Sequence, residues 1–185
     1  RQLAKVGRPV DREDWQMTPP EVNAYYDAQL NEIVFPAGIL QPPFFIKGAS
    51  DAVNFGAVGG VVGHELTHGF DDQGRRFDQA GNMREWWTPA DGKTFEERAA
   101  CIDTQYGGYT AVDDVKVNGK LTLGENVADN GGVRLAWMAL MERMKTRPNT
   151  RPWIWAEPSM TSTTGLSAVP TCVLEPTSQL DWHQI

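Results

Sequence analysis

The chain has 185 residues, of which 41% are hydrophobic, so it can form one domain with a core or belong to a larger protein. Its 17 basic and 24 acidic residues give a net charge of −7, which argues against nonspecific binding to nucleic acid and against anionic membrane surfaces. No apolar run approaches the roughly 20 residues that span a bilayer, and residues 1–12 lack the apolar stretch of a signal peptide. The two cysteines, Cys101 and Cys172, do not decide the redox compartment.

The first 45 residues predict irregular chain with two short strands. Residues 1–20 contain prolines that block regular structure. Residues 22–26 and 32–35 are short and rich in β-prone side chains, so we expect strands there. Residues 38–45 are apolar but interrupted by two prolines, which predicts a buried extended segment rather than a helix.

A helix is expected over about residues 52–69, with Ser50 or Asp51 as its N-cap. Three glycines lie between positions 59 and 63 of this helix, and each costs roughly 1 kcal/mol relative to alanine. Close packing of another segment against the helix is the simplest account of that cost.

The second half of the chain predicts a loop, two helices and an irregular tail. Residues 71–81 are rich in Asp and Gly and predict a loop, and residues 89–106 predict a helix with Thr88 as N-cap. Residues 118–119 predict a turn, and residues 125–145 a further helix. Apolar residues at spacings of three and four on this last helix predict a stripe in the core: Val133, Trp137, Leu140, Met141 and Met144.

The segment His64-Glu65-Leu66-Thr67-His68 lies within the first predicted helix. Residues four apart share one face of a helix, so the two imidazoles can reach one metal ion together. Glu65 lies beside His64 and can reach a water molecule on the same ion. This pattern is typical of zinc hydrolases, in which the glutamate is the general base. The alternative is a structural domain that contains the five-residue motif by chance.

A catalytic zinc ion takes three protein ligands and keeps one position for water. The remaining histidine, His183, lies in the tail, so we expect a carboxylate as the third ligand. Glu125 is preferred because Asp129 follows one helical turn later, so one carboxylate can bind zinc while the other orients a histidine. The alternative is that neither residue is near a metal: Glu125 would be an acidic residue that interacts favourably with the start of its helix, and Asp129 would lie on a solvent-exposed face. The spacing fits both interpretations equally well. The other downstream candidates are Glu85, Glu96, Glu97 and Glu142.

Four segments occur together in one order: residues 22–26, 33–45, 63–74 and 124–129. In this combination the chain resembles the catalytic core of the neprilysin family of zinc metalloendopeptidases. That family includes the endothelin-converting enzymes and the bacterial oligopeptidases of the O type. The resemblance covers about residues 7–145. It implies an α+β, mainly helical fold of the zincin-like, thermolysin-like (gluzincin) class, present here as an incomplete catalytic core.

The resemblance also implies roles for particular residues. His64, His68 and Glu125 match the ligands of one Zn²⁺ ion, and Glu65 matches the catalytic base. Asp129 matches the residue that orients the first histidine and is often assigned a proton-donor role.

Five further positions match residues that bind substrate in the family. Asn23 and Ala24 match the pair that binds the substrate backbone. Ile39, Phe44 and Val61 match positions that line the pocket for the side chain after the cleaved bond. Ordinary core packing is the alternative for these last three residues.

The sequence also departs from the family. It lacks the His-x-Pro-x-x-x-Arg segment that stabilises the oxyanion, the Cys-x-x-Trp near the family's C-terminus, and the large helical N-terminal domain. The family pattern places the partner of Cys101 in the missing C-terminal segment, so Cys172 would replace it only by accident. We therefore expect a partial catalytic domain over residues 1–145 and a non-matching, irregular tail over residues 146–185. A frameshifted or unrelated reading of the gene's end would produce such a tail, and resequencing the source locus tests this.

The expected function is zinc-dependent hydrolysis of short peptides, with Glu65 as general base. The expected partners are peptide substrates, the missing N-terminal helical domain and the missing C-terminal segment. An extracytoplasmic location (periplasmic, secreted or as a membrane-anchored ectodomain) is favoured over a cytoplasmic one. The alternative function is that of a zinc-binding fragment that is weak or inactive in catalysis and at most binds peptide.

Overall fold

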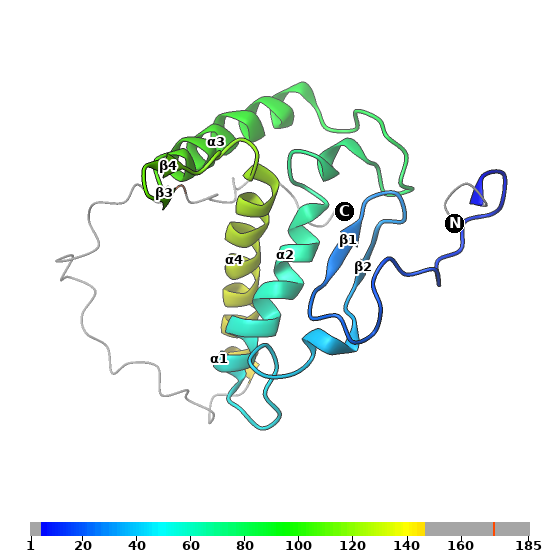
Figure 1. Cartoon of the computed structure of the whole chain (residues 1–185), viewed down its shortest axis with the longest axis vertical. Coiled ribbons are helices and arrows are strands. Elements are labelled where there is room, and N and C mark those ends of the chain that lie inside the picture. The colour runs from blue at the N-terminus through cyan, green and yellow to red at the C-terminus, as the bar shows by residue number, and fades with distance from the viewer. Residues whose placement is uncertain (1–4, 147–171, 173–185) are drawn as a thin grey trace.

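The computed structural model describes residues 5–146 and residue 172. Helix α2 (Gly60–His68) lies between the long helix α4 (Leu123–Thr146) and the hairpin of β1 (Tyr25–Asp27) and β2 (Glu32–Val34) (Figure 1). The predicted α+β, mainly helical fold class is confirmed. None of the helices in the described residues is both long and apolar enough to cross a bilayer.

Strands β1 and β2 pair antiparallel, with Tyr25 opposite Val34 and Asp27 opposite Glu32. The second strand lies where the sequence predicts it, whereas the first begins three residues later than expected. The side chain of Asp27 accepts hydrogen bonds from two backbone N–H groups of the turn between the strands, which closes the hairpin. The hairpin presents its first strand to α2 and so forms one side of the space beside the motif helix.

The segment at residues 38–45 differs from its prediction. It begins with a single 3₁₀ turn (Ala37–Ile39), and only the start of the segment is buried, because Leu40 is 49% exposed and Phe45 40%. Gly38 donates a hydrogen bond to the Pro19 carbonyl, and a β-carbon at Gly38 would overlap neighbouring backbone oxygens. Gly38 is thus held by contact with the loop that contains Pro19. Beyond Ile39 the segment is largely exposed, so the prediction of a buried extended segment is wrong there.

The predicted motif helix is continuous but changes its winding. Helix α1 (Asp51–Asn54) passes into a π-helical turn (Phe55–Gly59) and then into α2. Ser50 caps its start, because its side chain accepts a hydrogen bond from the Val53 N–H. The prediction of one helical segment that begins near residue 52 is therefore confirmed, and the π turn is an addition that apolar spacing did not indicate.

Helices α2 and α4 cross at two facing glycines. A β-carbon at Gly63 would lie 2.6 Å from the Gly132 carbonyl oxygen, and one at Gly132 would lie 2.6 Å from the His64 backbone nitrogen. Such short distances mean that the two backbones touch. The expectation that a close neighbour offsets the cost of the glycines is confirmed at Gly63. A β-carbon at Gly60 would meet no atom within 4 Å, so Gly60 has no such explanation.

The apolar stripe predicted on α4 does not form the buried face of this helix. Leu140 is buried, but Val133 is 67% exposed and Trp137 54%. The contact with α2 is made at Gly131 and Gly132, where a β-carbon would overlap Thr67 and the backbone of α2. The buried residues of α4 as a whole are Asn126, Val127, Ala128, Gly132, Ala136 and Leu140. Large side chains at this contact would hold the helices apart, so the bulky apolar residues lie on other faces of α4.

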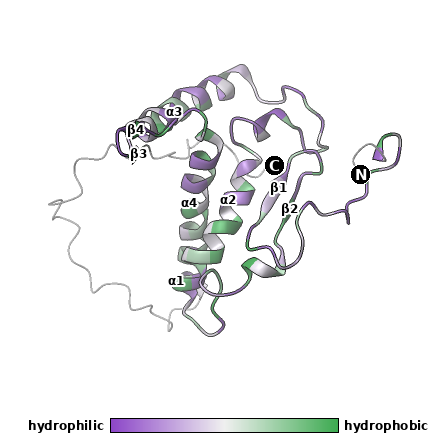
Figure 2. Cartoon of the chain, in the orientation of Figure 1, coloured by the Kyte–Doolittle hydropathy of each residue, from purple (hydrophilic) through white to green (hydrophobic). Residues whose placement is uncertain are grey.

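Helix α3 (Pro89–Gly107) matches its prediction, including the cap. The side chains of Thr88 and Asp91 each accept a hydrogen bond from the other residue's backbone N–H and so form a capping box. This helix is largely hydrophilic along its length (Figure 2). It is followed by a hairpin of β3 (Thr110–Val112) and β4 (Val115–Lys116) that the sequence did not predict, because strands of two or three residues carry no readable alternation.

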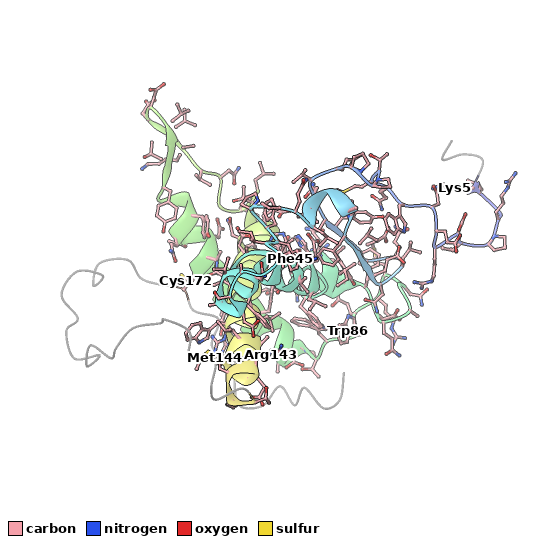
Figure 3. All side chains as sticks on the ribbon, turned by 90° about the horizontal axis from the view of Figure 1, so that it is seen from below. Lys5, Phe45, Trp86, Arg143, Met144 and Cys172 are labelled. Carbon is pink, nitrogen blue, oxygen red and sulfur yellow. A yellow bond between two sulfur atoms is a disulfide. The ribbon has the colours of Figure 1, made fainter. Side chains whose placement is uncertain are left out.

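Cys101 on α3 forms a disulfide with Cys172, and the two Cα atoms are 5.8 Å apart. The Cys172 N–H also donates to the Gln105 side chain on the same helix, so Cys172 lies against α3 (Figure 3). Cys172 thus takes the place of the partner that the family pattern puts in a missing C-terminal segment. The rest of the predicted tail, residues 147–171 and 173–185, lies outside the described residues.

Candidate metal centre

The two histidines of the motif and Glu125 converge on one point between α2 and the start of α4. The His64 Nε2 and His68 Nε2 atoms are 3.0 Å apart. The Glu125 Oε2 atom lies 3.3 Å from the first of these nitrogens and 3.7 Å from the second. Ligands held about 2.0–2.1 Å from zinc at tetrahedral angles are separated by about 3.3 Å, so these three side chains fit one zinc ion.

A carboxylate holds the far nitrogen of each imidazole. His64 Nδ1 donates to Asp129 Oδ1 at 2.8 Å, and His68 Nδ1 donates to Asp71 Oδ2 at 2.7 Å. Because a carboxylate can only accept, these hydrogen bonds favour the tautomer with the ring proton on Nδ1, which leaves the lone pair of each Nε2 available to a metal ion. Three electron-rich atoms that meet in this way form the donor set of a divalent cation.

The structure thus brings together the ligands and the orienting residue that the sequence singled out, although they lie far apart in the chain. His64 and His68 come from one face of α2, whereas Glu125 and Asp129 come from one face of α4. The glycine contact between these helices sets the distance between the two faces. Glu65 occupies the buried side of α2, where it is 5% exposed.

The surroundings change the pKa of two groups at this centre. Burial raises the pKa of the Glu65 carboxyl above its usual value, and the nearby Glu125 adds to the rise while the two histidines oppose it. The hydrogen bond to Asp71 raises the pKa of the His68 imidazole, and burial opposes part of that rise. A buried carboxyl with a raised pKa beside a cluster of metal-binding groups is typical of a functional site.

Asp71 is a site residue that the sequence interpretation missed. Its Oδ2 atom contacts His68, and its Oδ1 atom accepts hydrogen bonds from the backbone N–H groups of Gln73 and Gly74. The sequence carries a usable signal, because an aspartate three residues before a glycine, as Asp71 is before Gly74, is typical of a turn closed by a side chain. The Asp- and Gly-rich composition of residues 71–81 predicts only a loop.

We expect Asp71→Asn to weaken zinc binding by roughly 10- to 100-fold, because a neutral amide oxygen holds the His68 ring less firmly than a carboxylate does. A competition titration against a chromophoric chelator measures the dissociation constant. Asp114→Asn makes the same chemical change at an exposed turn position and should leave that constant unchanged. Equal zinc affinity in all three proteins would contradict a role for Asp71 at the metal centre.

A cleft of about 430 Å³ opens beside the converging side chains. Its lining includes the three metal-binding candidates, Glu65 and Asp71. Asn23 and Ala24, the predicted backbone-binding pair, lie on the opposite wall together with the first residues of β1. The cleft thus joins the metal-binding groups to an edge strand.

The three residues predicted to line a side-chain pocket are not part of this lining. Ile39 is 3% exposed, and Phe44 and Val61 are half-buried. The Phe44 carbonyl accepts a hydrogen bond from the Val58 N–H, which joins its loop to the π turn. A role in substrate selection for these three residues stays a prediction.

Comparisons with known proteins place the chain in a family. The model of peptidase family M13 matches residues 23–153. An endothelin-converting enzyme homolog of Locusta migratoria is 52% identical over 150 residues, which are 81% of this chain and 20% of that protein. The predicted domain boundary at residue 145 lies inside the matched range and stays a prediction.

Solved structures agree with this assignment. The zinc metalloprotease Zmp1 of Mycobacterium tuberculosis, in complex with an inhibitor, has a TM-score of 0.75 and 47% identity and covers 78% of this chain and 23% of its own. PepO of Lactobacillus rhamnosis has a TM-score of 0.68 and 45% identity, with 71% and 21% covered. The chain spans about a fifth of the length of the relatives that it matches. The resemblance to the neprilysin and endothelin-converting enzymes is confirmed, and the chain belongs to peptidase family M13.

Proposed function

We propose that this chain is part of the catalytic domain of a zinc-dependent endopeptidase that hydrolyses short peptides. In this proposal His64, His68 and Glu125 bind the zinc ion and Glu65 is the general base. The observation that carries the proposal is the convergence of the three ligand atoms within 3.7 Å, with both imidazoles oriented by carboxylates. The names of relatives, an endothelin-converting enzyme homolog and a zinc metalloprotease, support it.

Bound zinc would supply a Lewis acid that polarises a peptide carbonyl and makes a water molecule more acidic. Glu65 would take the proton from that water and deliver it to the leaving amine. Its buried position and raised pKa suit a carboxyl that must hold a proton between these two events. Asp129 would hold His64 in its ligating tautomer, and a proton-donor role for Asp129 belongs to the same proposal.

The substrate would lie extended along the side of β1 that does not pair with β2, where the Tyr26 backbone N–H donates a hydrogen bond to the Glu65 carboxyl. Among the described residues, β1 pairs only with β2, and its other side faces the cleft. An extended peptide can add to such an edge through backbone hydrogen bonds. Asn23 and Ala24 precede the strand at this position, and in this structure the Asn23 side chain accepts a hydrogen bond from the Ala24 N–H. A bound substrate would form hydrogen bonds with the Asn23 side chain and the Ala24 N–H in place of this one.

A second candidate function is zinc binding with weak or absent catalysis. The chain contains no His-x-Pro-x-x-x-Arg segment, so the donors that stabilise the oxyanion in the family are missing from these 185 residues. Removing one oxyanion donor costs roughly 10²–10³ in rate. An N-terminal helical domain and a C-terminal segment, supplied by a longer protein, are the partners that would complete the site.

Zinc content and peptide cleavage of the 185-residue chain test the proposal. We expect about one zinc ion per chain and cleavage of a fluorogenic peptide that a chelator stops and added zinc restores. Glu125→Gln should weaken zinc binding by more than about 100-fold. Removing a side chain that itself binds the metal costs more affinity than removing one, such as Asp71, that only orients a ligand. Glu142→Gln, an exposed change on the same helix, is the matched control.

The outcomes separate the alternatives. A folded chain that takes up no zinc would contradict both functions and favour a structural domain with a chance motif. Stoichiometric zinc without cleavage would support the binding fragment.

We also propose an extracytoplasmic location. The Cys101–Cys172 disulfide supports it, because disulfides persist in oxidising compartments and are rare in the cytosol. Counting free thiols in the denatured, unreduced native protein tests this, and two free thiols would contradict it.

A further inference from the structure

The side chain of Arg75 is enclosed at the start of α3 and is not part of the cleft lining. Its guanidinium carbon lies 4.9 Å from the centre of the Phe95 ring and 5.8 Å from that of Trp87, and the side chain is 16% exposed. Nη2 donates to the Glu96 carboxylate at 3.0 Å. A planar cation between aromatic rings and a carboxylate is held firmly, because stacking and ion pairing act on it together.

The start of α3 borders this side chain. A β-carbon at Gly92 would lie 3.4 Å from Arg75 Nη1, which is ordinary van der Waals contact, so the helix backbone passes directly beside the guanidinium. Phe95 and Glu96 lie on the next turn of the same helix.

The backbone of Arg75 closes the turn that holds the Asp71 side chain in place. The Arg75 N–H donates to the Asp71 carbonyl at 3.2 Å, and the Asp71 side chain accepts two further N–H groups within the same turn. Gly74 lies so close to the end of α2 that a β-carbon there would overlap the His68 carbonyl oxygen. Residues 71–75 thus run from the carboxylate that contacts His68 to the cation held by α3.

We propose that Arg75 is a positioning residue for the metal centre, which fixes the turn of residues 71–75 to α3 and so keeps the Asp71 carboxylate on His68. The inference rests on the proposed function. Arg75 is not part of the cleft lining and is not one of the converging metal-binding groups, so its effect on zinc must pass through Asp71. A purely structural role would change the unfolding temperature and leave the zinc affinity of the folded protein unchanged.

The test uses the full 185-residue chain, with zinc alone as the ligand in a competition titration. Arg75→Met keeps the length of the side chain but removes its charge and its planar group, and we expect zinc binding to weaken by about 2- to 30-fold. Arg75→Lys keeps the charge and should recover part of the loss. Arg76→Met changes the exposed neighbour and should leave the affinity unchanged. Circular dichroism at the titration temperature establishes that each variant is folded.

A double-mutant comparison identifies the route. In the Asp71→Asn background, Arg75→Met should weaken zinc binding by less than about 2-fold further, because the carboxylate through which it acts is gone. An equal effect in both backgrounds would overturn the proposal, and so would an unchanged zinc affinity in Arg75→Met. If Arg75→Met does not fold, Arg75→Gln, which also lacks the charge, replaces it and is read against the same 2-fold threshold.

Failure of the proposed function gives a different result. An unmutated chain that binds no zinc would refute the proposed function and this inference together. An unmutated chain that binds zinc, with Arg75→Met equal to it, would refute this inference alone.

Discussion

Glu65→Gln is expected to lower the rate of peptide hydrolysis by about 10²–10⁴ while zinc stays bound, because the amide cannot accept a proton from water. The side chain is 5% exposed and lies in the cleft beside His64, so Gln fills the same space without moving the ligands. Burial raises the pKa of this carboxyl, so a neutral isostere removes an unfavourable buried charge, and we expect no loss of stability.

The measurement is kcat/KM on a fluorogenic peptide, together with zinc content, for the variant and the unmutated chain. Glu85→Gln is the control, because Glu85 is exposed and lies outside the cleft lining. Equal rates for Glu65→Gln and the unmutated chain would show that the hydrolysis comes from a contaminating protease.

Gly132→Ala is expected to destabilise the chain by about 1–3 kcal/mol and to weaken zinc binding, although alanine is the better helix former. The added methyl group would lie 2.6 Å from the His64 backbone nitrogen and 2.6 Å from the Gly60 carbonyl oxygen. Neither backbone atom can move unless α2 and α4 separate. Because Glu125 and Asp129 lie on α4, separation also pulls them away from His64.

Gly60→Ala provides the matched control in the partner helix. A β-carbon at Gly60 meets no atom within 4 Å, so this variant should gain up to about 1 kcal/mol from helix propensity and bind zinc normally. Thermal unfolding and a zinc titration measure both effects. Equal stability of Gly132→Ala and Gly60→Ala would show that the two helices have room to adjust, contrary to the close contact described above.

The local part of the metal centre could be predicted because it depends on helix geometry alone. His64 and His68 share a face at a spacing of four residues, and Ser50 and Thr88 cap their helices as their sequences indicate. Glu125 was preferred from its neighbour Asp129, although its distance from the histidines depends on the contact of Gly63 with Gly132. The glycines of the motif helix indicated a close neighbour but did not say which segment it is.

Other features were missed for physical reasons. Periodicity predicts a core position for Val133 and Trp137 because it detects large apolar residues, whereas α4 meets α2 through Gly131 and Gly132, which such a search does not detect. Asp71 was missed because its role depends on hydrogen bonds within a turn, which leave no periodic pattern. The π turn at Phe55–Gly59 is likewise invisible to a search for regular helical spacing.

The disulfide between Cys101 and Cys172 makes a covalent ring that contains the whole of α4, and with it Glu125 and Asp129. Closing a ring of this length removes about 4 kcal/mol of chain entropy from the unfolded state. A protease that cuts the chain once inside the ring would leave both ends attached, so the helix with the proposed third metal ligand would stay tethered to α3. Its release would require reduction of the disulfide or a second cut.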